Sequence, residues 1–153
     1  MRPAERIRVT ADNREQIVWW FSPDEFEVVR GTMPAGDYAL TDNPQTLVIE
    51  RKTLDDLVQT VIRERERFER ELAKLATYHR AVVAIEGSLS DIARHGYTSA
   101  ASPASIVGLT NALFYDHGVA FVWLDNREIA QRWAARLFRI AARRIAEKAA
   151  VAA

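Results

Sequence analysis

The stretch "GDYALTDNPQTLVIERK", Gly36 to Lys52, decides the fold. Its two apolar runs, "YAL" and "TLVI", flank "TDNPQ", whose Asp, Asn and Pro are typical turn residues. We therefore predict a β-hairpin that turns between Asn43 and Pro44. This register matches apolar side chains across the two strands, which supports it. The matched pairs are Leu40 with Leu47 and Tyr38 with Ile49.

The same register gathers charge at the open end of the hairpin. Asp37 falls opposite Glu50, with Cβ atoms roughly 5 Å apart, and Lys52 lies on the same face as Glu50 because side chains alternate along a strand. Two such carboxylates must be solvated, share a proton or be bridged by a cation. Mg²⁺ and Mn²⁺ favour oxygen ligands of this kind, and Lys52 would then orient a metal-bound water and offset charge on a phosphoryl group. The alternative is an exposed strand end with solvated polar side chains.

Composition is that of an ordinary globular chain. With 153 residues, 48% of them apolar and 27% charged, residues 1–153 are expected to form a single domain with its own core. The absence of cysteine excludes disulfides and thiolate metal sites. There is no apolar run of about 18 residues and no secretory signal, so an intracellular, cytoplasmic protein is expected. Frequent Ala and Arg hint at a bacterial or phage origin.

Charge is unevenly distributed although the formal net charge is zero. From Arg127 to Lys148, seven Lys or Arg residues stand against two Glu residues. A basic end and a more acidic remainder fit a nucleic-acid contact surface near an acidic site. They fit ordinary charged surface helices equally well.

Periodicity predicts alternating strands and helices. Strands are expected at residues 6–10, 25–33, 36–40, 46–52, 80–87 and 119–124. Helices are expected at residues 15–21, 53–75, 102–117 and from 126 almost to the end, with Thr53 and Ser102 as caps and Gly118 as a stop. Antiparallel neighbours come early and parallel crossovers late. The fold class is therefore α/β, a central mixed β-sheet flanked by helices.

The hairpin also carries a family resemblance. "GDY" followed by "ERKTLDDL" resembles the G-D-…-E-R-K-x-x-x-D signature of the XPF-type structure-specific DNA endonucleases, members of the restriction-endonuclease-like superfamily. "VTADNRE" resembles the family's opening strand and D-x-R-E motif, and the stretch from Ser102 to Leu137 resembles its final helix, strand and helix. The resemblance covers nearly the whole chain.

The resemblance implies a restriction-endonuclease-like fold and a metal-dependent DNA endonuclease, acting on branched, flapped or forked DNA. The implied catalytic residues are Asp37, Glu50, Arg51, Lys52 and Asp56. The implied Mg²⁺ or Mn²⁺ ligands are Asp12, Asp37 and Glu50, with Glu15 as a further member of the acidic cluster. Arg14 and Arg51 are implied to contact DNA phosphates. Asp56 has a second reading, as part of the cap of the helix that Thr53 begins.

Partners are also implied. Family members usually carry a helix–hairpin–helix module after the nuclease domain and some carry a helicase before it, whereas this chain ends at Ala153 with room for neither. A DNA-targeting partner protein is therefore one expectation. Alternatives to a self-sufficient enzyme are a non-catalytic DNA-binding or dimerisation subunit, and a nuclease component that needs a partner. The intact "GDY" and "ERK" motifs disfavour a dead subunit.

The last helix carries two stripes at helical spacing. The apolar stripe is Ile129, Trp133, Leu137 and Ile140, and the basic stripe is Arg132, Arg136, Arg139 and Arg143. The apolar stripe either packs on the sheet or, as the family resemblance implies, serves a homodimer or heterodimer. The basic stripe would follow DNA phosphates. The run "RERERFERE" is interpreted as a solvated helix face, and the four Trp residues as core or interface residues.

Overall fold

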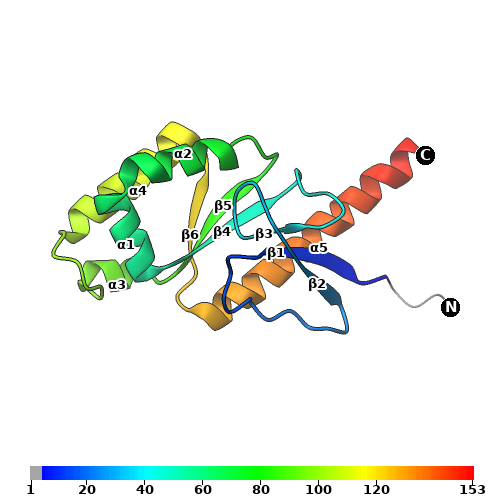
Figure 1. Cartoon of the computed structure of the whole chain (residues 1–153), viewed down its shortest axis with the longest axis horizontal. Helices are drawn as coiled ribbons and strands as arrows, with labels where there is room; N and C mark the ends of the chain where they lie inside the picture. Colours follow the sequence, from blue (N-terminus) through cyan, green and yellow to red (C-terminus); the bar gives the residue numbers. More distant parts are fainter. Residues whose placement is uncertain (1–4) are drawn as a thin grey trace.

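A computed structural model describes residues 5–153. It contains one mixed sheet in the strand order β2-β1-β3-β4-β5-β6 (Figure 1). The strands are β1 (Ile7–Asp12), β2 (Phe26–Gly31), β3 (Tyr38–Leu40), β4 (Val48–Thr53), β5 (Ala81–Glu86) and β6 (Ala120–Trp123). The helices are α1 (Leu54–Arg63), α2 (Arg65–Leu75), α3 (Leu89–Ala93), α4 (Pro103–His117) and α5 (Arg127–Ala152). The expected α/β class is confirmed.

The hairpin register is the predicted one. Strands β3 and β4 pair antiparallel, with Tyr38 opposite Ile49 and Ala39 opposite Val48. Strand β3 also pairs antiparallel with β1, while β1–β2, β4–β5 and β5–β6 are parallel. The short strand β3 thus holds together two parallel halves of the sheet.

Side-chain alternation gives the sheet two apolar faces. Ala39, Val48 and Val83 pack on the face covered by α1, α2 and α4. Tyr38 and Ile49 pack on the opposite face, against α5 and residues 18–21. Figure 1 shows α1 to α4 gathered together and α5 running separately along the sheet. A side chain at the end of a strand therefore points either to the α1–α2–α4 face or to the α5 face of the sheet.

The predicted helix boundaries follow from local hydrogen bonds. The Thr53 side chain accepts from the backbone N–H of Asp56 and caps α1, and the Ser102 side chain caps α4. Gly118, with φ of 71°, ends α4. Helix α3 was not expected, although Ser88 and Asp91 form a reciprocal capping box at its start. Within residues 5–153, no helix is long and apolar enough to cross a membrane.

The expected helix at residues 15–21 is wrong. This segment is irregular and belongs to a 13-residue connection between the parallel strands β1 and β2. The Trp19 side chain stacks on Tyr38 with ring centroids 4.6 Å apart, and its backbone N–H donates to the Tyr38 hydroxyl at 2.9 Å. An N–H bonded in this way is not available to a helix, so tertiary contacts prevail over the local pattern.

The expected single helix over residues 53–75 is broken at Glu64, whose φ of −120° lies outside the helical range. Its two parts, α1 and α2, bury their apolar residues in the same cluster. The charged run "RERERFERE" at the break has one apolar residue, Phe68, and so carries little apolar periodicity. The direction of the chain there is set by the packing of the apolar residues of α1 and α2 in the core.

The expected interior strand at residues 119–124 lies instead at an edge of the sheet, since β6 follows β5 at the end of the strand order. Its apolar composition has another cause. Phe121 and Trp123 pack on the α1–α2–α4 face, while Ala120 and Val122 pack on the α5 face. Because helices cover both faces of the sheet at this edge, β6 has the same near-continuous apolar sequence as a central strand.

Candidate active site

Asp37 and Glu50 lie opposite each other at the open end of the β3–β4 hairpin. The Asp37 backbone N–H donates to the Ile49 carbonyl at 2.9 Å, which continues the ladder beyond β3. The Asp37 Oδ2 accepts from the backbone N–H of Arg51 at 2.7 Å. Since Val48 packs on the α1–α2–α4 face, alternation directs Glu50 and Lys52 to that same face.

Glu50 is 8% exposed, an unusual position for a carboxyl group. Burial raises the pKa of Glu50 well above its ordinary value, and the charge of Asp37 with a hydrogen bond to its side chain raises it further. Lys52 opposes these effects only in part. In the absence of a bound cation, Glu50 therefore holds a proton more tightly than an exposed carboxyl group does.

The backbone before Asp37 depends on Gly36, whose φ is 75°. A Cβ at this position would lie 2.3 Å from Cγ2 of the buried Val48. We expect Gly36→Ala to destabilise the protein by about 2–4 kcal/mol, the sum of left-handed strain and overpacking. Urea denaturation measures this, with Gly108→Ala as the control, because a Cβ at Gly108 meets nothing within 4 Å. Equal stability of the two variants would contradict the expectation.

Asp12, at the end of β1, is 1% exposed and fully engaged in hydrogen bonds. Its carboxylate accepts from the Arg14 backbone N–H at 2.9 Å, from Arg14 Nε at 2.7 Å and from the Met33 backbone N–H at 2.8 Å. Burial would raise the pKa of Asp12, but these hydrogen bonds outweigh it and lower the pKa to about 2. Asp12 is thus an anion that holds Arg14 and the chain at Met33.

Lys52 reaches across to the helices that follow it. Its Nζ lies 3.4 Å from Thr60 Oγ1 and 5.3 Å from the centre of the Phe68 ring. Thr60 belongs to α1 and Phe68 to α2, so the ammonium group sits where the two helices meet. Contacts with a hydroxyl and an aromatic face leave Lys52 close to Glu50, whose pKa it lowers.

These residues border one cleft of about 290 Å³. It brings together all of the predicted site residues except the buried Asp12, and it adds Glu71 and Lys74 from α2, which sequence reasoning missed. The charged residues that line it are Arg14, Glu15, Asp37, Glu50, Arg51, Lys52, Asp56, Glu71 and Lys74. Glu71 ends the run "RERERFERE", interpreted above as a solvated face; its spacing of three from the apolar Phe68 was the available signal.

Arg51 points to the other face of the sheet from Glu50 and Lys52. Its guanidinium pairs with Glu86 at 2.6 Å and lies 3.6 Å from Glu15. The Glu86 side chain is 6% exposed and also accepts from the Trp19 indole N–H at 3.3 Å. Glu86 was not predicted, although a charge at the end of the apolar run "AVVAI" is the same signal as in "TLVIERK".

Glu15 extends this group of charges into the cleft. Its carboxylate accepts from the Tyr38 hydroxyl at 3.2 Å. Burial and the charge of Asp37 raise the pKa of Glu15, whereas Arg51 and Tyr38 lower it. The backbone N–H of Asp56 donates to the Thr53 side chain, whereas the hydrogen bonds of residues 5–153 include none from the Thr53 N–H to the Asp56 carboxylate. Only half of the expected capping box is therefore formed, and Asp56 also lines the cleft.

The family assignment agrees with this geometry. The model of the ERCC4 domain matches residues 11–137, from the end of β1 into α5. The chain belongs to the ERCC4 domain family. The XPF-type nuclease domain expected from the motif is thereby confirmed, and it includes Asp37, Glu50 and Lys52. No match was found among curated proteins.

Solved structures share the fold of this ERCC4 domain. XPF from Aeropyrum pernix superposes with a TM-score of 0.71 at 23% identity, covering 92% of this chain and 67% of that one. A structure of XPF from Aeropyrum pernix in complex with DNA gives a TM-score of 0.65 at 22% identity, covering 94% and 66%. The chain thus spans about two thirds of these relatives.

The donor set of this ERCC4 domain fits a divalent cation in part. Asp37 and Glu50 supply hard oxygen donors side by side, and the raised pKa of Glu50 marks a carboxyl that a cation would stabilise as an anion. Asp12 is occupied by Arg14 and Met33. Across residues 5–153, no three His, Asp or Glu side chains converge as a preformed metal cluster. The pair is therefore the core of the candidate site.

Proposed function

We propose that this ERCC4 domain is a divalent-metal-dependent endodeoxyribonuclease that hydrolyses phosphodiester bonds in branched, flapped or forked DNA. One observation carries the proposal, namely the buried Glu50 held against Asp37 in a cleft beside Lys52. A structural carboxyl pair gains nothing from such burial, because each charge disfavours the other. A pair that binds a cation is stabilised by it even when buried. Membership of the ERCC4 domain family supports a role for that cation in phosphodiester hydrolysis.

Asp37 and Glu50 would hold Mg²⁺ or Mn²⁺, and Asp12 would join them if Arg14 moved onto a phosphate. The metal would lower the pKa of a coordinated water and offset the charge of the scissile phosphate. Lys52 lies beside Glu50, where its ammonium group can orient the attacking water and stabilise charge on a phosphate oxygen. Its contacts with Thr60 and Phe68 restrict the motion of the side chain.

Arg14 is the cation of this site best placed to meet DNA. Its side chain is largely exposed, and in the DNA-free structure it pairs with Asp12 through Nε. A planar guanidinium suits bidentate phosphate contacts. XPF from Aeropyrum pernix has been solved in complex with DNA, which supports the same class of partner here.

The test is cleavage of end-labelled forked, flapped and plain duplex DNA of one sequence. With Mg²⁺ or Mn²⁺ we expect cuts near the branch point, and none with chelator present. A folded protein that binds these DNAs and leaves all of them intact with both metals would overturn the proposal of a self-sufficient enzyme.

We further propose that a second copy of the chain covers a groove between α5 and the β5–β6 edge. The fully buried side chains of α5 are Ala130, Ala134 and Phe138. Of the predicted apolar stripe, Trp133 and Leu137 pack in part against this core, whereas Ile129 and Ile140 are exposed. Trp133, Leu137 and Ile140 line an apolar groove of about 620 Å³ together with Val82 and Val122. An edge strand next to an apolar groove supports self-association.

Charging this groove should separate the dimer. We expect the wild type to have the mass of a dimer in light scattering coupled to size exclusion, and Ile140→Glu to have that of a monomer. Leu89→Glu is the control, because Leu89 on α3 is about as exposed as Ile140 and lies outside the groove. A monomeric wild type at tens of micromolar would refute the homodimer.

A further inference from the structure

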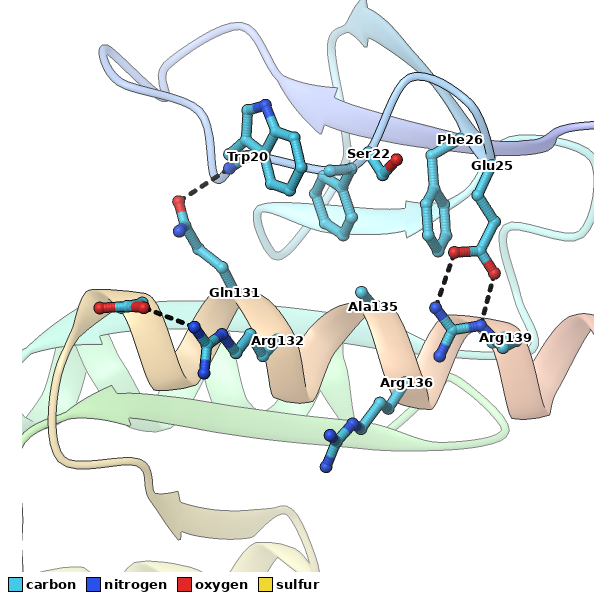
Figure 2. Close-up of a pocket in the computed structure, with 11 residues that line it drawn as sticks. Trp20, Ser22, Glu25, Phe26, Gln131, Arg132, Ala135, Arg136 and Arg139 are labelled. Carbon is cyan, nitrogen blue, oxygen red and sulfur yellow. Dashed lines mark hydrogen bonds and ion pairs between the residues drawn. The ribbon is translucent and has the colours of Figure 1, made fainter.

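A second pocket, of about 410 Å³, lies on the α5 side of the molecule (Figure 2). One wall is the segment from Trp20 to Phe26 and the other is α5 between Glu128 and Arg139. The phenyl rings of Phe21 and Phe26 form its apolar floor, packed 5.3 Å apart. None of the predicted catalytic residues lines it, so it is distinct from the catalytic cleft.

Trp20 is the unusual residue of this pocket. The neighbouring Trp19 is buried in the core, whereas Trp20 is 66% exposed. Trp20 is also anchored, since its backbone N–H donates to Gln131 Oε1 at 2.8 Å. The nearby Ile17 carbonyl accepts from Arg127 at 2.6 Å, which ties the same segment to the start of α5. The Trp20 indole is thus exposed to solvent on a backbone fixed by hydrogen bonds. This exposure is unfavourable, because burial of its apolar surface would stabilise the protein.

Three arginines of α5, Arg132, Arg136 and Arg139, line the pocket across from this indole. Figure 2 shows Trp20 on one side of the pocket and α5 on the other, with Arg132 directed along the helix and Arg136 directed away from Trp20. Arg139 is committed to Glu25 through a bidentate pair. Arg132 makes an exposed pair with Glu128, which is of little net value and easily exchanged. Arg136 is exposed and makes no ion pair within residues 5–153. Two cations are therefore available at the rim.

We propose that this pocket binds unpaired nucleotides of the DNA substrate, with a base stacked on Trp20 and phosphates contacting Arg132 and Arg136. The inference rests on the proposed nuclease function and extends it to the single-stranded part of a branched substrate. An aromatic face beside a guanidinium is the arrangement that binds unstacked nucleotides. A duplex keeps its bases stacked and would present only phosphates to the rim.

The position of the pocket supports this occupant over a protein. Glu15 borders the catalytic cleft and Trp20 borders the pocket, so the two sites are five steps apart along the chain. Fully extended, this segment spans at most about 18 Å, roughly five nucleotide steps at 3.4 Å. A strand that leaves the cleft along this segment reaches Trp20 within a few nucleotides of the cut.

The test measures binding without metal, so it does not depend on cleavage. Fluorescent oligothymidine, a matched duplex and a fork are titrated with wild type, Trp20→Ala, Trp20→Phe and Arg136→Gln in chelator by anisotropy. Tyr115→Ala and Arg70→Gln are the controls, because Tyr115 is exposed on α4 and Arg70 is exposed on α2 outside the pocket. Circular dichroism melts establish that each variant folds.

We expect Trp20→Ala to bind oligothymidine and the fork about 5- to 100-fold more weakly, with duplex binding little changed and Trp20→Phe between the two. Arg136→Gln should reduce the salt slope for the single strand by roughly 0.7. Unchanged single-strand binding by folded Trp20→Ala would overturn the proposal. So would a wild type that binds none of these DNAs, which would leave the pocket to a protein ligand. Single-strand binding lost in Trp20→Ala by a protein that never cuts would support the pocket while the nuclease proposal failed.

Discussion

Replacing Glu50 with Gln should abolish metal-dependent cleavage and at the same time make the metal-free protein more stable at neutral pH. Gln has the shape of a protonated Glu, so it fits the buried position without a charge that Asp37 opposes. It cannot serve as an anionic metal ligand. We expect a loss of about 10²–10³-fold or more in cleavage rate, the scale of removing one charge-stabilising group from an active site.

The sign of the stability effect follows from the raised pKa of Glu50. Between the unfolded pKa of about 4.3 and the higher folded pKa, the folded state holds more protons than the unfolded state. The free energy of unfolding of the metal-free wild type therefore falls as pH rises through this window. Glu50→Gln has no titrating carboxyl group at this position, so its free energy of unfolding does not fall in this way. The variant should therefore match the wild type in stability at pH 4 and exceed it increasingly toward pH 8.

Thermal melts at pH 4, 6 and 8, with chelator or with Mg²⁺, measure this. Added Mg²⁺ should raise the Tm of the wild type at pH 8, because it binds the folded state, and should raise that of Glu50→Gln much less. Glu66→Gln, on the exposed surface of α2, is the matched control for removal of a carboxylate. A Glu50→Gln variant less stable than wild type at pH 8 in chelator would show that Glu50 is a structural anion.

Arg51→Met should lower stability by about 3–5 kcal/mol, because it leaves the buried Glu86 and the largely buried Glu15 without their shared cation. At roughly 2–4 °C per kcal/mol for a chain of this size, the Tm would fall by about 6–20 °C. Denaturant unfolding and thermal melts at pH 7 measure the loss. Arg132→Met, which breaks an exposed pair with Glu128, should change stability by less than about 1 kcal/mol.

A double variant separates the structural role of Arg51 from contact with DNA. Arg51→Met combined with Glu86→Gln removes both charges of the 2.6 Å pair and should recover part of the lost stability. If Arg51→Met is as stable as wild type yet binds DNA more weakly, its guanidinium belongs to the phosphate contacts that the sequence implied. Loss of stability would instead make Arg51 the residue that positions β4 from behind, with Glu50 and Lys52 at the front.

Much of the site could be predicted because it depends on local rules. The hairpin register follows from matching apolar residues on either side of one turn, and it places Asp37 opposite Glu50. The helix that starts after Thr53 and the one that starts after Ser102 follow from short capping patterns. Side-chain alternation along β4 also predicts that Arg51 lies on the opposite face of the sheet from Glu50 and Lys52. Reading "ERK" as a single motif overlooked this difference.

The remaining features depend on groups far apart in the chain. Trp19 pairs with Tyr38 and Glu86 instead of extending a helix, Asp12 meets the backbone of Met33, and Trp20 faces solvent across from α5. Hydrophobic periodicity predicts whether a side chain is buried, but it does not predict which helix or strand packs against it. Sequence therefore specifies the strands, the register and the acidic pair, whose partners lie within one hairpin. The strand order, the two faces of the site and the free indole arise only when distant segments pack together, because burial and charge pairing are properties of the assembled sheet.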